Sequence, residues 1–174
     1  VHRLDKDTSG VLVVAKNDRA HHHLSRQFKS RRVKKEYLAL VYGKMESDSG
    51  SVSLPIGRHP VDRKKMSTNS RKSRVAETTW QIRERFELAS LIEINLKTGR
   101  THQIRVHCAA IKHPVMGDNV YGPRKTGKNV TYGKNLFGSV PRQMLHAWRI
   151  VLTHPATEAM VSFEAPIPSD MQDV

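Results

Sequence analysis

Two adjoining segments, residues 75–86 and 88–97, have the pattern of β-strands joined by a very short connection. In the second segment, Ile92, Ile94 and Leu96 alternate with polar or charged residues. Side chains along a strand point alternately to its two faces, so these three apolar residues share one face. Strands joined this tightly pair antiparallel. The chain is therefore constrained to a sheet that is antiparallel at this point.

The remaining apolar segments add more strands than helices. Residues 10–16 have the pattern of a largely buried strand, and residues 35–43 alternate like another. A short segment that contains a proline, residues 52–56, suits the edge of a sheet, because proline cannot donate a backbone hydrogen bond. Residues 143–153 and 159–165 are expected to form a closing pair of strands.

Two helices are expected. The first follows Asn17 or Asp18, either of which can cap it, and its apolar residues recur along one face. The second covers residues 101–112 and is stopped by a proline. Polar stretches at residues 58–74 and 117–141 are expected to be loops. Together these elements predict an α+β domain, a mainly antiparallel mixed sheet flanked by a few helices.

The charge balance indicates a polyanionic partner. Thirty Lys and Arg residues against 16 Asp and Glu give a formal net charge of +14. Such an excess repels itself in the compact state unless a polyanion neutralises it. Nucleic acid is the favoured partner, and an anionic membrane surface is the second. No apolar run approaches the roughly 20 residues that span a bilayer, and no amphipathic helix rich in Trp or Phe supports membrane binding.

The length of 174 residues suits one domain. The single cysteine, Cys108, excludes an intrachain disulfide and a cysteine-based zinc cluster, and it fits a reducing compartment such as the cytoplasm. The first residue is Val1 rather than Met, so an N-terminal module or address signal is expected to be missing.

Three segments carry the residue types of a reactive site. Asp5 lies in a loop before an apolar segment, a rigid place to hold a reactive group. Tyr37 follows residues 29–35, of which five are Lys or Arg. Arg100 and Arg105 flank the expected start of a helix, a position that attracts anions. Each also has an ordinary structural interpretation: a carboxylate closing a turn, a cross-strand aromatic and a solvated basic face.

The order and spacing of these segments resemble the RluA-type pseudouridine synthase family, most closely its RluD-like branch, which modifies large-subunit ribosomal RNA. The most specific pairing is HRLD followed by TSG near the start, together with GRTHQIR from residue 99 onward. The resemblance covers nearly the whole chain. Its motifs, in chain order, are HRLDKDTSG, KEYLALVYG, IGRHPVDRKKM, KTGRTHQIRVH, HPVMGDNVYG, RQMLHA and FEAPIP.

The resemblance implies a set of site residues. Asp5 is expected to be the catalytic carboxylate, Tyr37 a general acid or base beside the pyrimidine, and Arg105 the partner of Asp5. Arg3 is expected to hold the target base out of the RNA helix or to fill the gap that it leaves, and Ile104 to pack against the base. Arg100 is expected to be structural or to face a phosphate. The basic charge of residues 58–74, rather than the resemblance, predicts RNA contacts from Arg63, Lys64 and Lys65.

The resemblance also implies a domain organisation. Members of the family generally carry another strand, and often an S4-type RNA-binding domain, before the HRLD segment. The chain is therefore expected to be a single catalytic domain over residues 1–174, with that N-terminal part absent.

The implied reaction is an isomerisation, in which a uridine loses its N-glycosidic bond, rotates and rejoins the sugar through C5. It needs no redox step and no external group, so neither a cofactor nor a metal is expected. It needs a carboxylate that stays ionised while shielded from water. Burial alone would neutralise Asp5, whereas a bidentate pair with Arg105 favours the charged form. Whether Asp5 attacks C1′, attacks the pyrimidine ring or removes a sugar proton stays open.

A uridine within an RNA helix must leave its stack before a side chain can reach it, at a cost of a few kcal/mol. The basic stretches at residues 29–35 and 58–74 are the expected source of compensating phosphate contacts, which weaken as salt rises. We hypothesise that the second stretch clamps the RNA. Large-subunit ribosomal RNA is the first expected substrate, transfer RNA is the second, and a monomer is expected.

Other interpretations have less support. Residues 122–128 match the first seven positions of a phosphate-binding P-loop, but Asn129 stands where the Ser or Thr ligand of magnesium belongs. Three consecutive histidines, residues 21–23, point in three directions on a helix and cannot chelate together. A metal-dependent nuclease would need clustered carboxylates. A non-catalytic RNA-binding module explains the charge, but it does not explain why Asp5, Tyr37 and Arg105 are all present.

Overall fold

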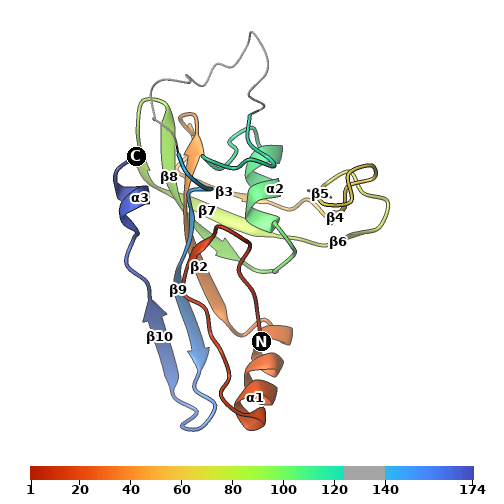
Figure 1. Ribbon diagram of the computed structural model, residues 1–174, viewed down its shortest axis with the longest axis vertical. Coiled ribbons are helices and arrows are strands. Elements are labelled where there is room, and N and C mark those ends of the chain that lie inside the picture. The colour runs from red at the N-terminus through yellow and green to blue at the C-terminus, as the bar shows by residue number, and fades with distance from the viewer. Residues whose placement is uncertain (124–139) are drawn as a thin grey trace.

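The chain is built on a seven-stranded, mainly antiparallel sheet, which the computed structural model describes over residues 1–123 and 140–174 (Figure 1). Its strands lie in the order β1-β9-β2-β8-β7-β3, and β10 pairs with β9. The elements are β1 (Ser9–Gly10), α1 (Asp18–Lys29), β2 (Lys34–Tyr42), β3 (Ser49–Val52), β4 (Ile56–Arg58), β5 (Met66–Ser67), β6 (Ser73–Arg74), β7 (Thr78–Arg85), β8 (Ala89–Leu96), α2 (Gln103–Ala110), β9 (Leu145–Thr153), β10 (Met160–Glu164) and α3 (Ser169–Gln172).

The central strands follow the predicted pattern. The expected hairpin is formed by β7 and β8, which pair antiparallel, and β2 pairs antiparallel with both β8 and β9. The closing pair is β9 with β10. Among the described strands, β1 with β9 is the parallel pair. The predicted α+β class with a mixed, mainly antiparallel sheet is confirmed.

The expected strand at residues 10–16 is wrong in extent, because β1 contains only Ser9 and Gly10. The residues that follow run without strand pairing among the described residues. They nevertheless alternate in burial: Val11 and Val13 pack against a core cluster, whereas Val14 is 74% exposed. The continuous apolar run therefore indicated a buried strand, although two of its side chains, Leu12 and Val14, are exposed.

The expected loop at residues 58–74 is also wrong in part. Residues of β5 and β6 pair antiparallel with β4 in a separate three-stranded sheet, β5-β4-β6, which projects beside α2 (Figure 1). Strands of two residues are too short to show alternation in sequence, so the pairing was missed. The expected edge strand at residues 52–56 is displaced, because the edge strand of the main sheet is β3 and residues 53–55 lead out of it.

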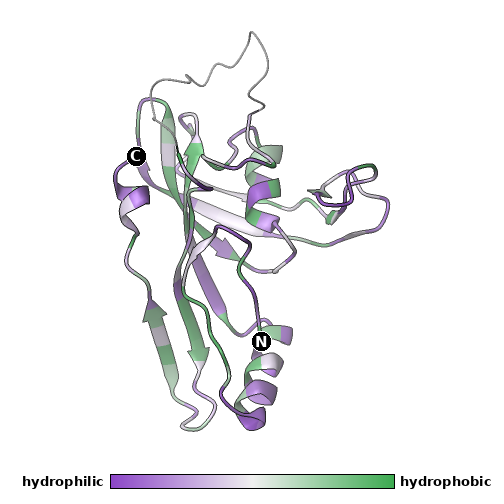
Figure 2. Cartoon of the chain, viewed as in Figure 1, coloured by the Kyte–Doolittle hydropathy of each residue, from purple (hydrophilic) through white to green (hydrophobic). Residues whose placement is uncertain are grey.

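The two long helices cover different parts of the molecule. As predicted, Asn17 caps α1, and its side chain accepts a hydrogen bond from the backbone N–H of Ala20 over 2.9 Å. The second helix begins at Gln103, two residues later than expected, because His102 has a left-handed backbone with φ of 55°. The N-cap residue is His102, whose side chain makes no capping hydrogen bond. Figure 2 shows that most of α1 is hydrophilic, whereas the central strands mix both kinds of residue.

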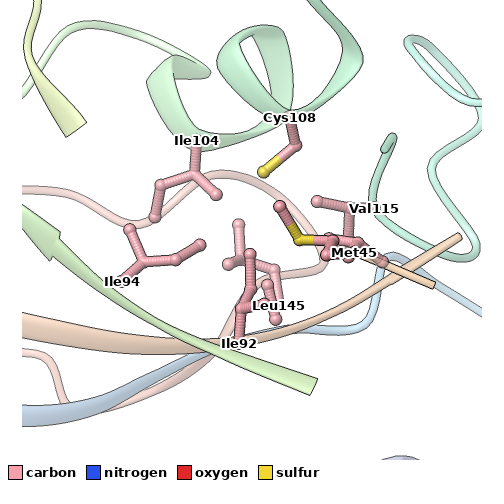
Figure 3. Close-up of a cluster of buried hydrophobic side chains, with 9 residues drawn as sticks. Met45, Ile92, Ile94, Ile104, Cys108, Val115 and Leu145 are labelled. Carbon is pink, nitrogen blue, oxygen red and sulfur yellow. The ribbon is translucent and has the colours of Figure 1, made fainter. Parts of the chain in front are cut away.

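The main core lies between α2 and one face of the sheet. Ile104 and Cys108 of α2 pack against Ile92 and Ile94 of β8 and against Leu145 of β9 (Figure 3). All five side chains are buried. This packing anchors the start of α2 directly over the middle of the sheet. Among the described helices, none combines the length and the apolar character of a membrane span.

Candidate active site

A cavity of about 500 Å³ opens beside the N-terminal loop. It is lined by three stretches that are distant in sequence: the N-terminal residues 1–5, the passage from the end of α1 into β2, and the turn that joins β8 to α2. Five of the site residues predicted from the sequence line this cavity: Arg3, Asp5, Tyr37, Arg100 and Ile104.

The loop that carries Asp5 is held by its own backbone and by a residue just before β9. Within the loop, the backbone N–H of Thr8 donates to the carbonyl oxygen of Asp5 over 3.1 Å. The side-chain amide of Gln143 donates to the carbonyl oxygen of Lys6 over 3.0 Å and to the hydroxyl of Thr8 over 2.7 Å. These contacts fix Asp5 and the backbone that follows it, and Asp5 lines the cavity.

His2 fixes the opposite end of the same loop. Its Nε2 accepts a hydrogen bond from the backbone N–H of Val13 over 2.9 Å, and its ring stacks on Phe28 with centroids 4.7 Å apart. Burial lowers the pKa of His2 to about 4. The imidazole is therefore neutral near pH 7, which matches its role as a hydrogen-bond acceptor.

Tyr37 projects from β2 into the same cavity. Its pKa is raised to about 12, first by burial and then by the negative charge of Asp5. The phenol therefore keeps its proton at neutral pH and can act as a hydrogen-bond donor beside a carboxylate. A phenol in this position can exchange a proton with a bound pyrimidine.

Arg105 lies behind Asp5, in the first turn of α2, and its Nη1 is 3.7 Å from Asp5 Oδ2. The expected bidentate pair is made with a different carboxylate. Arg105 donates from Nε to Asp118 Oδ2 over 2.7 Å and from Nη2 to Asp118 Oδ1 over 2.9 Å. Although burial opposes it, the hydrogen bond from Arg105 holds the pKa of Asp118 below its ordinary value.

Asp118 was not among the site residues predicted from the sequence. Its Oδ1 also accepts hydrogen bonds from the backbone N–H groups of Val120, over 2.8 Å, and Tyr121, over 3.0 Å. Its side chain is fully buried. A buried arginine needs a carboxylate partner. The acid of the HPVMGDNVYG motif, which is Asp118, could therefore have been proposed as the partner of Arg105.

The turn before α2 is organised by Gln103. Its Oε1 accepts from the hydroxyl of Thr98 over 2.8 Å and from the backbone N–H of Arg100 over 3.0 Å. Its Nε2 donates to the hydroxyl of Thr78 over 3.0 Å, and that hydroxyl is 2.8 Å from Nδ1 of His107. Several polar residues of the KTGRTHQIRVH motif thus shape the turn. The backbone N–H of Arg100 is already used there, and it is not free to bind an anion.

Cations line the cavity on two sides. Lys29, Arg31 and Lys35 lie on the side of α1 and β2, and Lys97, which pairs with Glu77, and Arg100 lie on the turn after β8. Burial and the charge of Arg31 lower the pKa of Lys35. Positive charge that lines a cavity attracts phosphate groups and raises the local concentration of an anionic substrate.

The other predicted RNA contacts lie apart from the cavity. Arg63, Lys64 and Lys65 occupy the turn between β4 and β5 in the small sheet, and none of them lines the cavity. Hydrogen bonds fix this turn; for example, the backbone N–H of Lys65 donates to the carbonyl oxygen of Asp62 over 2.9 Å. The three cations are therefore carried on ordered backbone that projects beside α2 (Figure 1).

The P-loop-like segment and the three consecutive histidines add no described residue to the lining of the cavity. Most of the P-loop-like segment, residues 124–128, lies outside the described residues. Over residues 1–123 and 140–174, no group of three or more His, Cys, Asp or Glu side chains is arranged to hold a metal.

Comparison with known proteins places the chain in a family. The family model described as RNA pseudouridylate synthase matches residues 1–110. A protein of Nitrosomonas europaea named ribosomal large subunit pseudouridine synthase D is 47% identical over 171 residues, covering 98% of this chain and 48% of that protein. A protein of the same name from Xanthomonas campestris pv. campestris is 44% identical, with 99% and 52% covered.

Solved structures agree with this result. Human RNA pseudouridylate synthase domain containing 1 has a TM-score of 0.79 and 34% sequence identity, over 95% of this chain and 67% of that one. The chain belongs to the RNA pseudouridylate synthase family. The predicted RluA-type membership, closest to the RluD-like branch, is confirmed. The chain spans about half the length of the curated relatives that it matches.

Proposed function

We propose that this protein isomerises specific uridines to pseudouridine in RNA. The observation that carries the proposal is the placement of Asp5 and Tyr37 at one cavity, with the guanidinium of Arg105 3.7 Å behind Asp5. This arrangement supplies a carboxylate next to a cation and a neutral proton donor. Membership of the RNA pseudouridylate synthase family supports the same reaction.

The reaction conserves all the atoms of the base except for an exchange of protons. The bond between N1 and C1′ breaks, the uracil rotates, and a bond forms between C5 and C1′. C5 then loses its hydrogen, and N1 ends with a proton. We assign Asp5 as the group that acts on the nucleotide and Tyr37 as a group that exchanges a proton near the base.

Arg105 has an electrostatic role in this proposal. Its contact with Asp5, at 3.7 Å, is longer than a hydrogen bond, so it places a positive charge beside the carboxylate without occupying an oxygen lone pair. Both carboxylate oxygens therefore remain free to react. This is consistent with attack on C1′, attack on the pyrimidine ring or removal of a sugar proton.

The substrate that we propose is large-subunit ribosomal RNA, with the target uridine turned out of its helix. Similarity to proteins named ribosomal large subunit pseudouridine synthase D supports this choice. The cations that line the cavity would bind flanking phosphates, and Arg3, which also lines it, would contact the extruded base or fill its gap. Ile104 would form part of the apolar wall against the base.

We further propose that the protein acts as a monomer in the cytoplasm. An RNA substrate is found there, and the reducing conditions of that compartment suit the buried free thiol of Cys108.

The test is to incubate the protein separately with unmodified large-subunit ribosomal RNA and unmodified transfer RNA, and then to map pseudouridine. Asp5→Asn is the active-site variant, and Asp48→Asn, which removes an exposed acid that pairs with Arg85, is the matched control. We expect product in ribosomal RNA with the wild type and the control, and none with Asp5→Asn. Product in transfer RNA alone would contradict the proposed substrate. Tight RNA binding by the wild type without product in either RNA would instead support a non-catalytic binding module.

A further inference from the structure

The two oxygens of Asp118 bind the Nε and Nη2 groups of Arg105, and the contact with Asp5 is left to Nη1. Paired hydrogen bonds between an arginine and a carboxylate fix the plane of the guanidinium. Asp118 is fixed in turn by the backbone N–H groups of Val120 and Tyr121. The direction in which Nη1 points is thus set by a carboxylate that does not line the cavity.

The ring of Tyr121 confines the same guanidinium from another side. The central carbon of Arg105 lies 5.1 Å from the ring centroid, within the range of a cation–π contact. The hydroxyl of Tyr121 is 2.8 Å from Nδ1 of His102, and it accepts a hydrogen bond from the backbone N–H of Met66 over 2.8 Å. The ring is therefore held between the start of α2 and strand β5 of the small sheet.

We propose that Asp118 and Tyr121 are positioning residues, which hold Arg105 so that its charge reaches Asp5 while both carboxylate oxygens of Asp5 remain available. The inference rests on the proposed function, because it assigns a purpose to the pair of Arg105 with Asp5. Without Asp118, the guanidinium would be free to turn and form the bidentate pair with Asp5 itself. That pair would occupy the oxygens that the reaction needs.

A change at Asp118 also alters the charge around Asp5. The titratable and charged groups that interact with one another there are Arg3, Asp5, Tyr37, His102, Arg105, Asp118 and Tyr121. Replacing Asp118 by Asn removes one negative charge from this group and one of the two carboxylate oxygens that bind Arg105. The chemical step should therefore be impaired, whereas RNA binding, which depends on the cations that line the cavity, should not change.

The experiment measures single-turnover product formation with saturating enzyme and, separately, the affinity for the RNA. The variant is Asp118→Asn, which keeps an oxygen to accept from the two backbone N–H groups. The matched control is Glu93→Gln, which removes a buried acid that pairs with Arg83. We expect Asp118→Asn to lower the rate about 10-fold to 100-fold, the scale of a catalytic group misplaced by about 1 Å, while RNA affinity stays at the wild-type value. The control should retain both the wild-type rate and the wild-type affinity.

A second variant keeps the inference testable if Asp118→Asn does not fold. Tyr121→Leu removes the ring face and the hydroxyl and leaves all the charges in place, so the rate should fall while RNA affinity stays at the wild-type value. A wild-type rate in Asp118→Asn, or a wild-type rate in Tyr121→Leu, would overturn the inference alone. A wild-type protein that binds RNA and forms no product would overturn the proposed function.

Discussion

The side-chain amide of Gln143 donates a hydrogen bond over 2.7 Å to the hydroxyl of Thr8, across 135 positions of the sequence. The same amide donates to the carbonyl oxygen of Lys6. One residue just before β9 thus binds the loop that carries Asp5 at two points. The position of the reactive carboxylate depends on the segment that leads into the main sheet as well as on its own loop.

Replacing Gln143 by Leu, which is similar in size, removes both bonds and leaves the carbonyl oxygen of Lys6 without this donor. Loss of such a partner costs about 1–3 kcal/mol. We expect the free energy of unfolding in urea to fall by that amount, and the single-turnover rate to fall further because Asp5 is less well held. The control is Gln81→Leu on the exposed side of β7. Equal rates in the two variants would show that Gln143 does not position the loop.

Gly10 has a φ of +116°, and a Cβ atom added there would lie 2.2 Å from the carbonyl oxygen of Ala147. Gly10→Ala therefore combines a strained backbone with a collision against β9. We expect a loss of at least about 1–3 kcal/mol in the free energy of unfolding, the usual cost of strained backbone. Gly99→Ala is the control, since its added Cβ would approach only Lys35 Nζ, at 3.4 Å. A Gly10→Ala protein as stable as Gly99→Ala would contradict the close approach of β1 to β9.

Local sequence patterns predicted those elements whose structure depends mainly on residues close together in the sequence. The periodicity of β8 and the capping residue of α1 are each visible within a dozen positions. The small sheet was not predictable in this way, because β5 and β6 are two residues long and exist only through pairing with β4. The same reasoning explains the error at β1, whose pairing with β9 depends on residues far along the chain.

The candidate site was predictable only in part, for a similar reason. Asp5, Tyr37 and Arg105 are distant in sequence, and the family resemblance, rather than periodicity, placed them together. The position of Asp118 depends on a pair between residues of α2 and of the loop after it. A sequence shows that Arg105 needs a carboxylate, but it does not show which one, and so Asp5 was assigned a bidentate contact that Asp118 makes.

Stability should decrease in mild acid because of His2. Its pKa is about 4 in the folded protein against 6.5 for an unperturbed histidine. Between these two pH values the unfolded chain binds a proton at His2 that the folded chain does not bind. The free energy of unfolding that comes from neutral His2 is therefore fully present above pH 6.5 and is lost as the pH falls toward 4. Urea unfolding at pH 5 and pH 7.5 should show a smaller difference in His2→Gln than in the wild type. His21→Gln, on the exposed surface of α1, is the control. The same pH difference in both variants would exclude His2 as the cause.

The turn between β4 and β5 should contribute to RNA binding through charge. Replacing Arg63, Lys64 and Lys65 by Ala should weaken binding and reduce the slope of log affinity against log salt by about 2 to 3, if each cation meets one phosphate. The control for nonspecific charge loss is the double variant Lys16→Ala and Arg19→Ala, which changes one exposed residue before α1 and one in its first turn. An unchanged affinity and salt slope in the triple variant would contradict the clamp hypothesis.

The release of hydrogen from C5 tests the central claim most directly. In the proposed reaction, C5 of the target uridine forms a bond to C1′ and loses its hydrogen to water. RNA that carries tritium at C5 should therefore release tritium during a single turnover with the wild-type protein. Asp5→Asn, which keeps the shape of the side chain and removes its charge, should release none while still binding the RNA. Tritium release by Asp5→Asn at the wild-type rate would contradict the assignment of Asp5 as the reactive carboxylate.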